Sequence, residues 1–164
     1  MAHPNEELIE RLYDAFNRGD GEAMAGCYAA GARFSDPVFT GLGEDEGPAM
    51  WRMLTGRANE LSVHLLEHHA DDERGTAHWT ADYTFRTGRR VHNDVRAEFR
   101  FRDGKIIEHR DSFDFAGWAR QALGPVGKLL GRTQFLHAKV QKQARADLDK
   151  FQAEAARESA RSDG

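Results

Sequence analysis

The spacing of the apolar residues changes near Asn59, and this change constrains the fold more than any other feature of the sequence. Before it, apolar residues recur at intervals of three and four, which is the period of amphipathic helices. After it, apolar and polar residues alternate in four segments: 61–69, 76–86, 91–102 and 106–115. Asp103 and Gly104 between the last two segments are a strong signal for a short hairpin. The chain is therefore predicted to be an α+β protein with a meander of four antiparallel strands.

The N-terminal part is predicted to hold three helices and one short strand. A first helix spans Asn5 to Arg18, and a second follows Gly21 with Cys27 and Tyr28 on its apolar face. A third begins at Pro48, a residue suited to the first turn of a helix.

Residues 33–39 resemble a short strand that is interrupted by Pro37. Proline cannot donate a hydrogen bond to a neighbouring strand, so this strand is expected at an edge or a bend of the sheet. It carries Asp36 at its end.

The C-terminal part is predicted to be helical. A short helix spans 117–123, an irregular apolar turn rich in glycine and proline follows at 124–131, and a last helix runs from Thr133 to Ser159. Its apolar residues form a narrow stripe: Leu136, Val140, Ala144, Leu148, Phe151 and Ala155. The stripe indicates packing on the sheet of the same chain or on a second subunit, and its narrowness favours a helix pair.

Composition excludes several classes of protein. With 23 basic and 27 acidic residues among 164, the net charge is -4, which gives no support for binding to nucleic acid. The only cysteine, Cys27, cannot form an internal disulfide, and a buried thiol in the reducing cytoplasm is expected. No apolar run approaches the roughly 18 residues of a membrane span, and the N-terminus does not resemble a signal peptide.

No metal or cofactor is expected. His64, His68 and His69 are close in sequence, but their spacing along a strand suits joint ligation poorly, and no cysteine pair completes a set. The sequence also lacks a nucleophile elbow, a phosphate-binding glycine loop and a dinucleotide-binding fingerprint.

Two acids are the strongest candidates for chemistry. In the segment 106–115, His109 and Asp111 alternate onto the same face as large apolar residues, so both are expected to be partly buried with polar partners. Together with Asp36 they would form a simple acid/base apparatus. Three other interpretations stay open: Asp111 bonded to an arginine at the rim of the sheet, Asp36 accepting backbone N–H groups in a turn, and His109 as a core or rim histidine.

The order of these elements resembles the nuclear-transport-factor-2-like superfamily, which includes ketosteroid isomerases and SnoaL-like polyketide cyclases. The resemblance covers about Asn5 to Trp118 and is carried by the segments 12–20, 34–37 and 99–111. It implies an α+β cone, in which a curved antiparallel sheet and helices enclose an apolar pocket, often in a homodimer. The cone would span 1–132, with 133–164 as a helical extension.

The resemblance also implies roles for single residues. The general-base aspartate of ketosteroid isomerases matches Asp36, whereas their oxyanion-binding tyrosine matches Leu12, next to Tyr13, and their second oxyanion acid matches Ala97. The acid/base aspartate of SnoaL-like cyclases matches Asp111.

The histidine partner of that cyclase aspartate falls at or near Ala97, so His109 is the candidate substitute. The ketosteroid isomerase reaction is therefore not expected, because its oxyanion donors are missing.

Two hypotheses about function remain. The first is a cofactor-independent isomerase, cyclase or epoxide hydrolase for an apolar cyclic substrate, in which Asp111 or Asp36 transfers a proton and His109 assists. Aromatic residues would line its pocket: Tyr13, Trp51, Trp79, Tyr83, Phe99, Phe113 and Trp118. The second is a non-catalytic ligand-binding or dimerisation module of the same fold.

Overall fold

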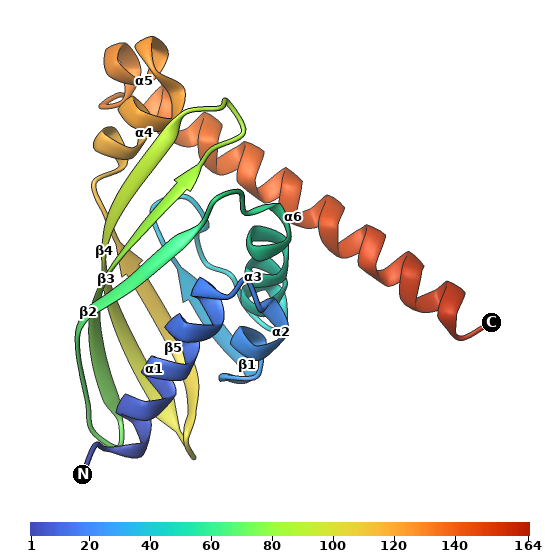
Figure 1. Ribbon diagram of the computed structural model, residues 1–164. Helices are drawn as coiled ribbons and strands as arrows, with labels where there is room; N and C mark the ends of the chain where they lie inside the picture. The colour runs from blue at the N-terminus through green and yellow to red at the C-terminus, as the bar shows by residue number, and fades with distance from the viewer.

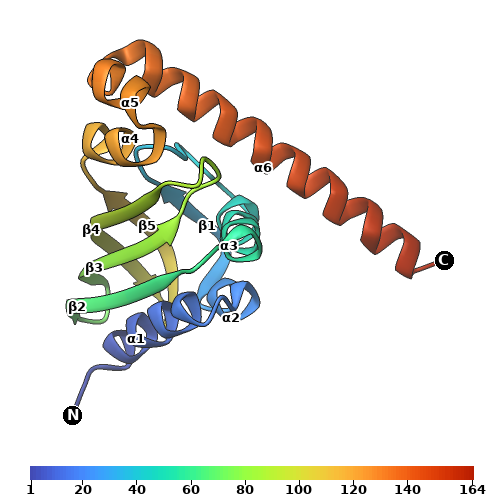
Figure 2. The same ribbon diagram turned by 45° about the horizontal axis from the view of Figure 1, so that its top comes forward.

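The computed structural model describes residues 1–164 as one curved sheet with helices on one side and at one end (Figure 1). In chain order, the elements are α1 (Pro4–Asn17), α2 (Gly21–Ala25), β1 (Tyr28–Ser35), α3 (Glu46–Arg57), β2 (Ser62–Ala70), β3 (Arg74–Thr84), β4 (Arg90–Arg102), β5 (Lys105–Ser112), α4 (Phe115–Leu123), α5 (Pro125–Leu130) and α6 (Gln134–Ser162). Helices α1 to α3 lie on one side of the sheet, and α4, α5 and the start of α6 lie at one end of it (Figure 2).

The sheet is mixed, with the strand order β1-β5-β4-β3-β2. Strands β2 to β5 form the predicted antiparallel meander, and β1 is the predicted edge strand. However, β1 pairs in parallel with β5, so the expectation of a wholly antiparallel sheet was wrong at this edge. This pairing joins segments that are far apart in the sequence, for example Phe34 and His109.

The second predicted helix is shorter than expected, since α2 ends at Ala25 and Tyr28 already belongs to β1. The carbonyl of Cys27 accepts a hydrogen bond from the backbone N–H of Ile106, and Tyr28 pairs with Ile106 on β5. Pairing with β5 therefore outweighs the helical spacing of the local sequence.

The interior contains two apolar clusters. The main core lies between the sheet and helices α1 to α3, and includes Leu12, Trp51 and Trp79. The end cluster lies where α4 and α6 meet the sheet, and its buried members are Val91, Phe115, Trp118, Ala119, Ala122 and Leu136. Val38, Tyr83 and Phe113 are partly buried against both clusters, so they mark the boundary between them.

The glycine-rich segment before α6 is helical rather than irregular, which corrects the prediction for 124–131. Helix α5 packs on α4 so closely that a Cβ atom at Gly127 would lie 1.8 Å from the carbonyl oxygen of Ala119. Gly127 therefore permits a close helix contact instead of ending a helix.

The last helix packs on its own chain for only part of its length. Leu136, Ala144 and Leu148 are buried, and Arg145 forms an ion pair with Glu46 of α3. Beyond Phe151 the side chains are largely exposed, including Ala155 of the predicted stripe, and the helix extends away from the body of the molecule (Figures 1 and 2). No helix of the chain combines the length and apolar character that a membrane span requires.

Candidate functional site

The parallel pairing of β1 with β5 brings the two candidate acids together. Phe34 lies opposite His109 and Ser35 lies opposite Arg110, so Asp36, the next residue, follows beside Asp111. Burial, and to a smaller extent the charge of Asp111, raises the pKa of Asp36. Two of the residues selected from the sequence are therefore neighbours in space.

Asp111 and His109 form a buried pair on the inner face of β5. His109 Nε2 lies 2.7 Å from Asp111 Oδ1, and the two residues are 1% and 5% exposed. The arginine partner considered for Asp111 is absent, because the only hydrogen bond of its carboxylate is to His109. Its second oxygen, Oδ2, has no hydrogen-bond partner.

Tyr28 contacts the other ring nitrogen of His109, Nδ1, and Trp51 bonds to Tyr28. The Trp51 indole N–H donates to the Tyr28 hydroxyl oxygen at 2.8 Å, and that hydroxyl lies 2.8 Å from His109 Nδ1. Since an indole nitrogen can only donate, the hydroxyl hydrogen of Tyr28 is free to point at Nδ1. Nδ1 then accepts, and Nε2 carries the hydrogen that is donated to Asp111. This arrangement gives a partner to the Trp51 N–H, to the Tyr28 hydroxyl and to both ring nitrogens of His109.

Tyr28 was missed in the sequence, where it was placed on the apolar face of a helix. Trp51 was selected as a pocket residue, but its N–H bonds to Tyr28, and its ring packs against Phe16, Phe34 and His109. In the sequence, Ala32 and Phe34 alternate with Arg33 and Ser35, and extending this period of two back to Tyr28 would have placed Tyr28 on a strand.

Asp36 is anchored through one oxygen, as the turn interpretation expected. Its Oδ1 accepts the backbone N–H groups of Val38 and Phe39 at 2.7 and 2.6 Å, and its own N–H donates to the carbonyl of Phe39. Burial raises the pKa of Asp36 to about 7, although the two N–H groups act in the opposite direction. Like Asp111, Asp36 keeps its Oδ2 without a hydrogen-bond partner, so a structural and a chemical role are compatible here.

Two further polar groups are buried without any partner. They are the hydroxyl of Tyr13 on α1 and the indole N–H of Trp79 on β3, whose rings lie 5.2 Å apart. Burial, and next the charge of Asp111, raise the pKa of Tyr13 well above its usual value, so this hydroxyl is a neutral donor near that acid. Buried donors without partners are rare, so these two groups are candidates for contact with a bound molecule.

Small side chains lie beside these donors in the sheet. Ala77 and Ala97 lie in the same row as Asp111, and Trp79 lies on β3 two residues beyond Ala77. On the intervening strand β4, Ala97 pairs with Asp111 and Val95 pairs with Trp79.

The other aromatic residues selected from the sequence form packed walls. The Trp118 N–H donates to the Tyr83 hydroxyl at 2.8 Å, and the Phe99 ring lies 4.4 Å from the His109 ring. Phe113 is partly buried between the main core and the end cluster.

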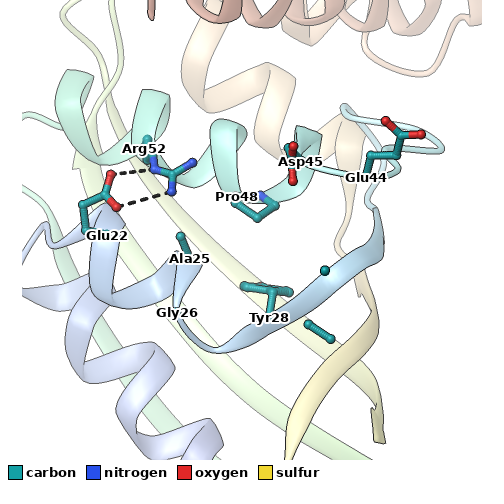
Figure 3. A pocket seen from close by; sticks show the side chains of 10 residues that line it. Glu22, Ala25, Gly26, Tyr28, Glu44, Asp45, Pro48 and Arg52 are labelled. Carbon is teal, nitrogen blue, oxygen red and sulfur yellow. Dashed lines mark hydrogen bonds and ion pairs between the residues drawn. The ribbon is translucent and has the colours of Figure 1, made fainter. Parts of the chain in front are cut away.

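Two of the surface hollows lie away from the acids. The larger, of about 310 Å³, is lined by residues of α2, β1 and α3, among them Tyr28 and the ion pair of Glu22 with Arg52 (Figure 3). The smaller, of about 90 Å³, lies between the 38–42 segment and α6. Neither hollow reaches Asp36 or Asp111, so the apolar pocket around these acids stays a prediction.

Two of the three histidines of β2, His68 and His69, pair with acids of α1. His68 lies 2.9 Å from Glu10, and His69 lies 3.2 Å from Glu6. No three histidine, cysteine or acidic side chains of the chain are grouped so that they could hold a metal ion.

Comparison with known families gives a match over most of the sheet. A family model described as a SnoaL-like domain matches residues 9–109, which include most of α1, the five strands up to His109, and the position of Asp36. No curated protein sequence matches the chain.

Solved structures share the fold. An NTF2-like protein of unknown function from Burkholderia pseudomallei has 23% identity and a TM-score of 0.65, over 73% of this chain and 97% of its own. An LEH-like epoxide hydrolase from M. tuberculosis has 19% identity and a TM-score of 0.63, over 77% and 95%. A proposed polyketide cyclase from Xanthomonas campestris has 21% identity and a TM-score of 0.63, over 72% and 96%.

Proposed function

The chain belongs to the SnoaL-like family, and on this premise we propose that it is a cofactor-independent acid/base enzyme acting on an apolar substrate with a carbonyl oxygen. One observation carries the proposal: the buried pair of His109 and Asp111 leaves a carboxylate oxygen free beside a second acid, Asp36. Fold neighbours described as a polyketide cyclase and an epoxide hydrolase support acid/base chemistry on small molecules.

In the proposed reaction, Asp111 is the general base. Its free oxygen removes a proton from the carbon next to the carbonyl, and the C–H electron pair moves to form an enolate. The hydrogen bond from His109 to Oδ1 holds the carboxylate of Asp111 in position for this step.

Asp36 is the matching general acid. With a pKa of about 7, a large fraction of its carboxyl groups is protonated at neutral pH. Returning this proton to another carbon gives an isomerisation. If the enolate carbon first attacks a second carbonyl of the same molecule, a C–C bond forms, the new alkoxide takes the proton, and the product is cyclic.

The unpartnered donors suit the substrate oxygen. The Tyr13 hydroxyl and the Trp79 N–H are neutral hydrogen-bond donors that would meet the oxygen as it gains negative charge. An epoxide oxygen can accept the same hydrogen bonds, which keeps epoxide hydrolysis, with water as co-reactant, as a second reaction for the same residues.

A cytoplasmic location suits this enzyme. Cys27 is a free, buried thiol, and burial raises its pKa, so little reactive thiolate forms. Such a cysteine neither needs nor provides a disulfide.

A non-catalytic binding or dimerisation module is the second candidate. It is favoured by the position of the two hollows, since neither reaches Asp111. In that case the chain of contacts from Trp51 to Asp111 would only satisfy buried polar groups.

The first prediction separates these candidates through Asp111→Asn. The wild type should exchange the α-hydrogens of cyclic ketones and 1,3-diketones for deuterium in D₂O, and the variant should be about 10²- to 10⁴-fold slower, as for the loss of a general base. Proton NMR measures the exchange, and hydrolysis of cyclohexene oxide is followed in parallel.

The control is Asp94→Asn, because Asp94 forms a similar pair with His78, at 2.8 Å, on the outer face of the sheet. This variant should keep the wild-type rate. If the wild type exchanges none of the compounds and opens no epoxide, the acid/base proposal is wrong and the binding module replaces it.

A further inference from the structure

The start of α6 contacts the turn that carries Asp36. His137 Nε2 lies 2.6 Å from the backbone carbonyl oxygen of Pro37, and the side-chain amide nitrogen of Gln141 lies 3.1 Å from the same oxygen. Both helix residues are partly buried. Two donors from one helix thus converge on the carbonyl that directly follows Asp36.

The chemistry of the carbonyl fixes which atoms donate. A carbonyl oxygen can only accept, so His137 Nε2 carries the hydrogen, and the nearby NH₂ group of Gln141 donates the second bond. Nε2 of His137 therefore cannot accept from Gln141, although the two nitrogens are 3.3 Å apart.

His137 also contacts the chain that follows Asp111. Its ring stacks on the ring of Phe115 with the centroids 4.2 Å apart and an angle of 15° between the planes. Phe115 begins α4, shortly after Asp111, and is buried in the end cluster. One side chain therefore contacts the Asp36 turn on one side and the segment after Asp111 on the other.

The residues that make these contacts from α4 and α6, Phe115, His137 and Gln141, lie outside the matched family region. The family model ends at residue 109, before α4 and α6 begin. The three fold neighbours are matched over 95% or more of their own lengths but over at most 77% of this chain. About a quarter of the chain is thus additional to the fold they share.

We propose that His137 and Gln141 are positioning residues, through which the C-terminal extension fixes the orientation of Asp36 beside Asp111. Within the turn, the carboxylate of Asp36 accepts hydrogen bonds from the backbone N–H groups of the two residues that follow Pro37. From α6, His137 and Gln141 donate to the carbonyl oxygen of Pro37. The consequence for catalysis rests on the function proposed above, whereas the positioning itself can be measured without turnover.

Loss of the outer donors should open the turn to water. A hollow of about 90 Å³ already lies beside Gln141 and Phe39, so solvent is close. A Pro37 carbonyl without its donors would take water as a partner, and the backbone N–H groups would hold Asp36 less firmly. Asp36 would then be better hydrated and would titrate more like an ordinary aspartate.

The test is the titration of the Asp36 carboxyl carbon by ¹³C NMR, with the signal assigned by its loss in Asp36→Asn. In the wild type the midpoint should lie near 7, and in His137→Ala it should move toward 3.8 by at least about one pH unit. Gln141→Ala should move it in the same direction by less, because one donor remains.

Two variants separate positioning from charge and from general damage. His137→Gln keeps a neutral N–H donor and should restore a midpoint near the wild-type value, which a charge effect of the imidazole would not. Lys139→Ala changes an exposed residue of the same helix and should leave the midpoint unchanged. The charge of Asp111 raises the pKa of Asp36, and the charge of Asp36 raises the pKa of Tyr83. Both Asp111 and Tyr83 are present in all of these variants.

An unchanged midpoint in a folded His137→Ala protein overturns the proposal. If that variant does not fold, the midpoint of Gln141→Ala decides instead, and a value equal to that of the wild type has the same meaning. A shifted midpoint in a protein that catalyses no exchange supports the positioning role and rejects only the enzyme function.

Discussion

At the scale of single residues, Asp36 is the group whose ionisation opposes folding. Its pKa is about 7 in the fold, because of burial, against an ordinary value of 3.8. The folded protein therefore holds a proton that the unfolded chain releases between these two values. The contribution of Asp36 to stability is full below about pH 4, decreases as the pH rises from about 4 to 7, and is lost above about 7.

This sign gives a prediction for Asp36→Asn. Asparagine stays neutral, and its side-chain oxygen can accept the same N–H groups of Val38 and Phe39. Above about pH 7 the variant should be more stable than the wild type, by on the order of 4 kcal/mol at most, and the difference should disappear near pH 4. Urea unfolding of both proteins at several pH values across this range measures the difference in unfolding free energy. If that difference does not change with pH, Asp36 titrates in the fold as an ordinary aspartate does.

The pH dependence of the unfolding free energy of the wild type alone cannot isolate the contribution of Asp36. Backbone hydrogen bonds lower the pKa of Glu6 and of Asp71, so these acids add stability that is lost as the pH falls through their folded pKa values. Because they are unchanged in Asp36→Asn, they cancel in the difference.

The candidate acids were predictable because their signals are local. The alternation in 106–115 places His109 and Asp111 on the inner face, and the proline after Asp36 marks a turn. The partners were not predictable. Tyr28 reaches His109 across 81 residues and His137 reaches Pro37 across 100, and neither distance leaves a trace in the periodicity of the sequence.

At the scale of elements, α6 consists of a packed half and an exposed half. Removing residues 153–164 should change the thermal midpoint little, because these side chains are exposed. Removing 134–164 should destabilise the fold by several kcal/mol, since Leu136, Ala144 and Leu148 would no longer cover the core. Thermal melts followed by circular dichroism compare the two truncations, and equal midpoints would mean that the packed half contributes nothing.

The elements that sequence periodicity predicted best are those whose neighbours are also close in sequence. Strands β2 to β5 follow one another as hairpins, so each alternating segment could be paired with the next. The parallel pairing of β1 with β5 was not visible, since it depends on the fold between them. Helix α5 was missed because its glycines were interpreted as helix breakers, whereas Gly127 permits a contact with α4.

At the scale of the whole molecule, the two apolar clusters meet beside Asp36. Val38, two residues after this acid, is partly buried against both of them, as are Tyr83 and Phe113. The main core lies almost entirely within the matched family region, whereas most buried residues of the end cluster lie on α4, which follows that region. The site is therefore bounded on one side by the matched region and on the other by the elements that follow it.

The chain is expected to form a homodimer, and the surface of α5 and of the start of α6 suggests where. Val126, Leu129 and Phe135 are 53%, 81% and 70% exposed, and they lie on α5 and at the start of α6. Large apolar side chains gathered in so short a segment favour an interface over exposure to water. The double change Leu129→Glu and Phe135→Glu should therefore yield a monomer of 18.5 kDa with a core that remains folded.

Light scattering after gel filtration measures this mass, and Leu66→Glu is the matched control. Leu66 is 56% exposed on the edge strand β2, far from the extension in the sheet order. The change Leu66→Glu should leave the dimer intact. If Leu66→Glu dissociates the dimer and the double variant does not, the interface lies on the sheet. If the wild type is a monomer, the expectation of a dimer is wrong.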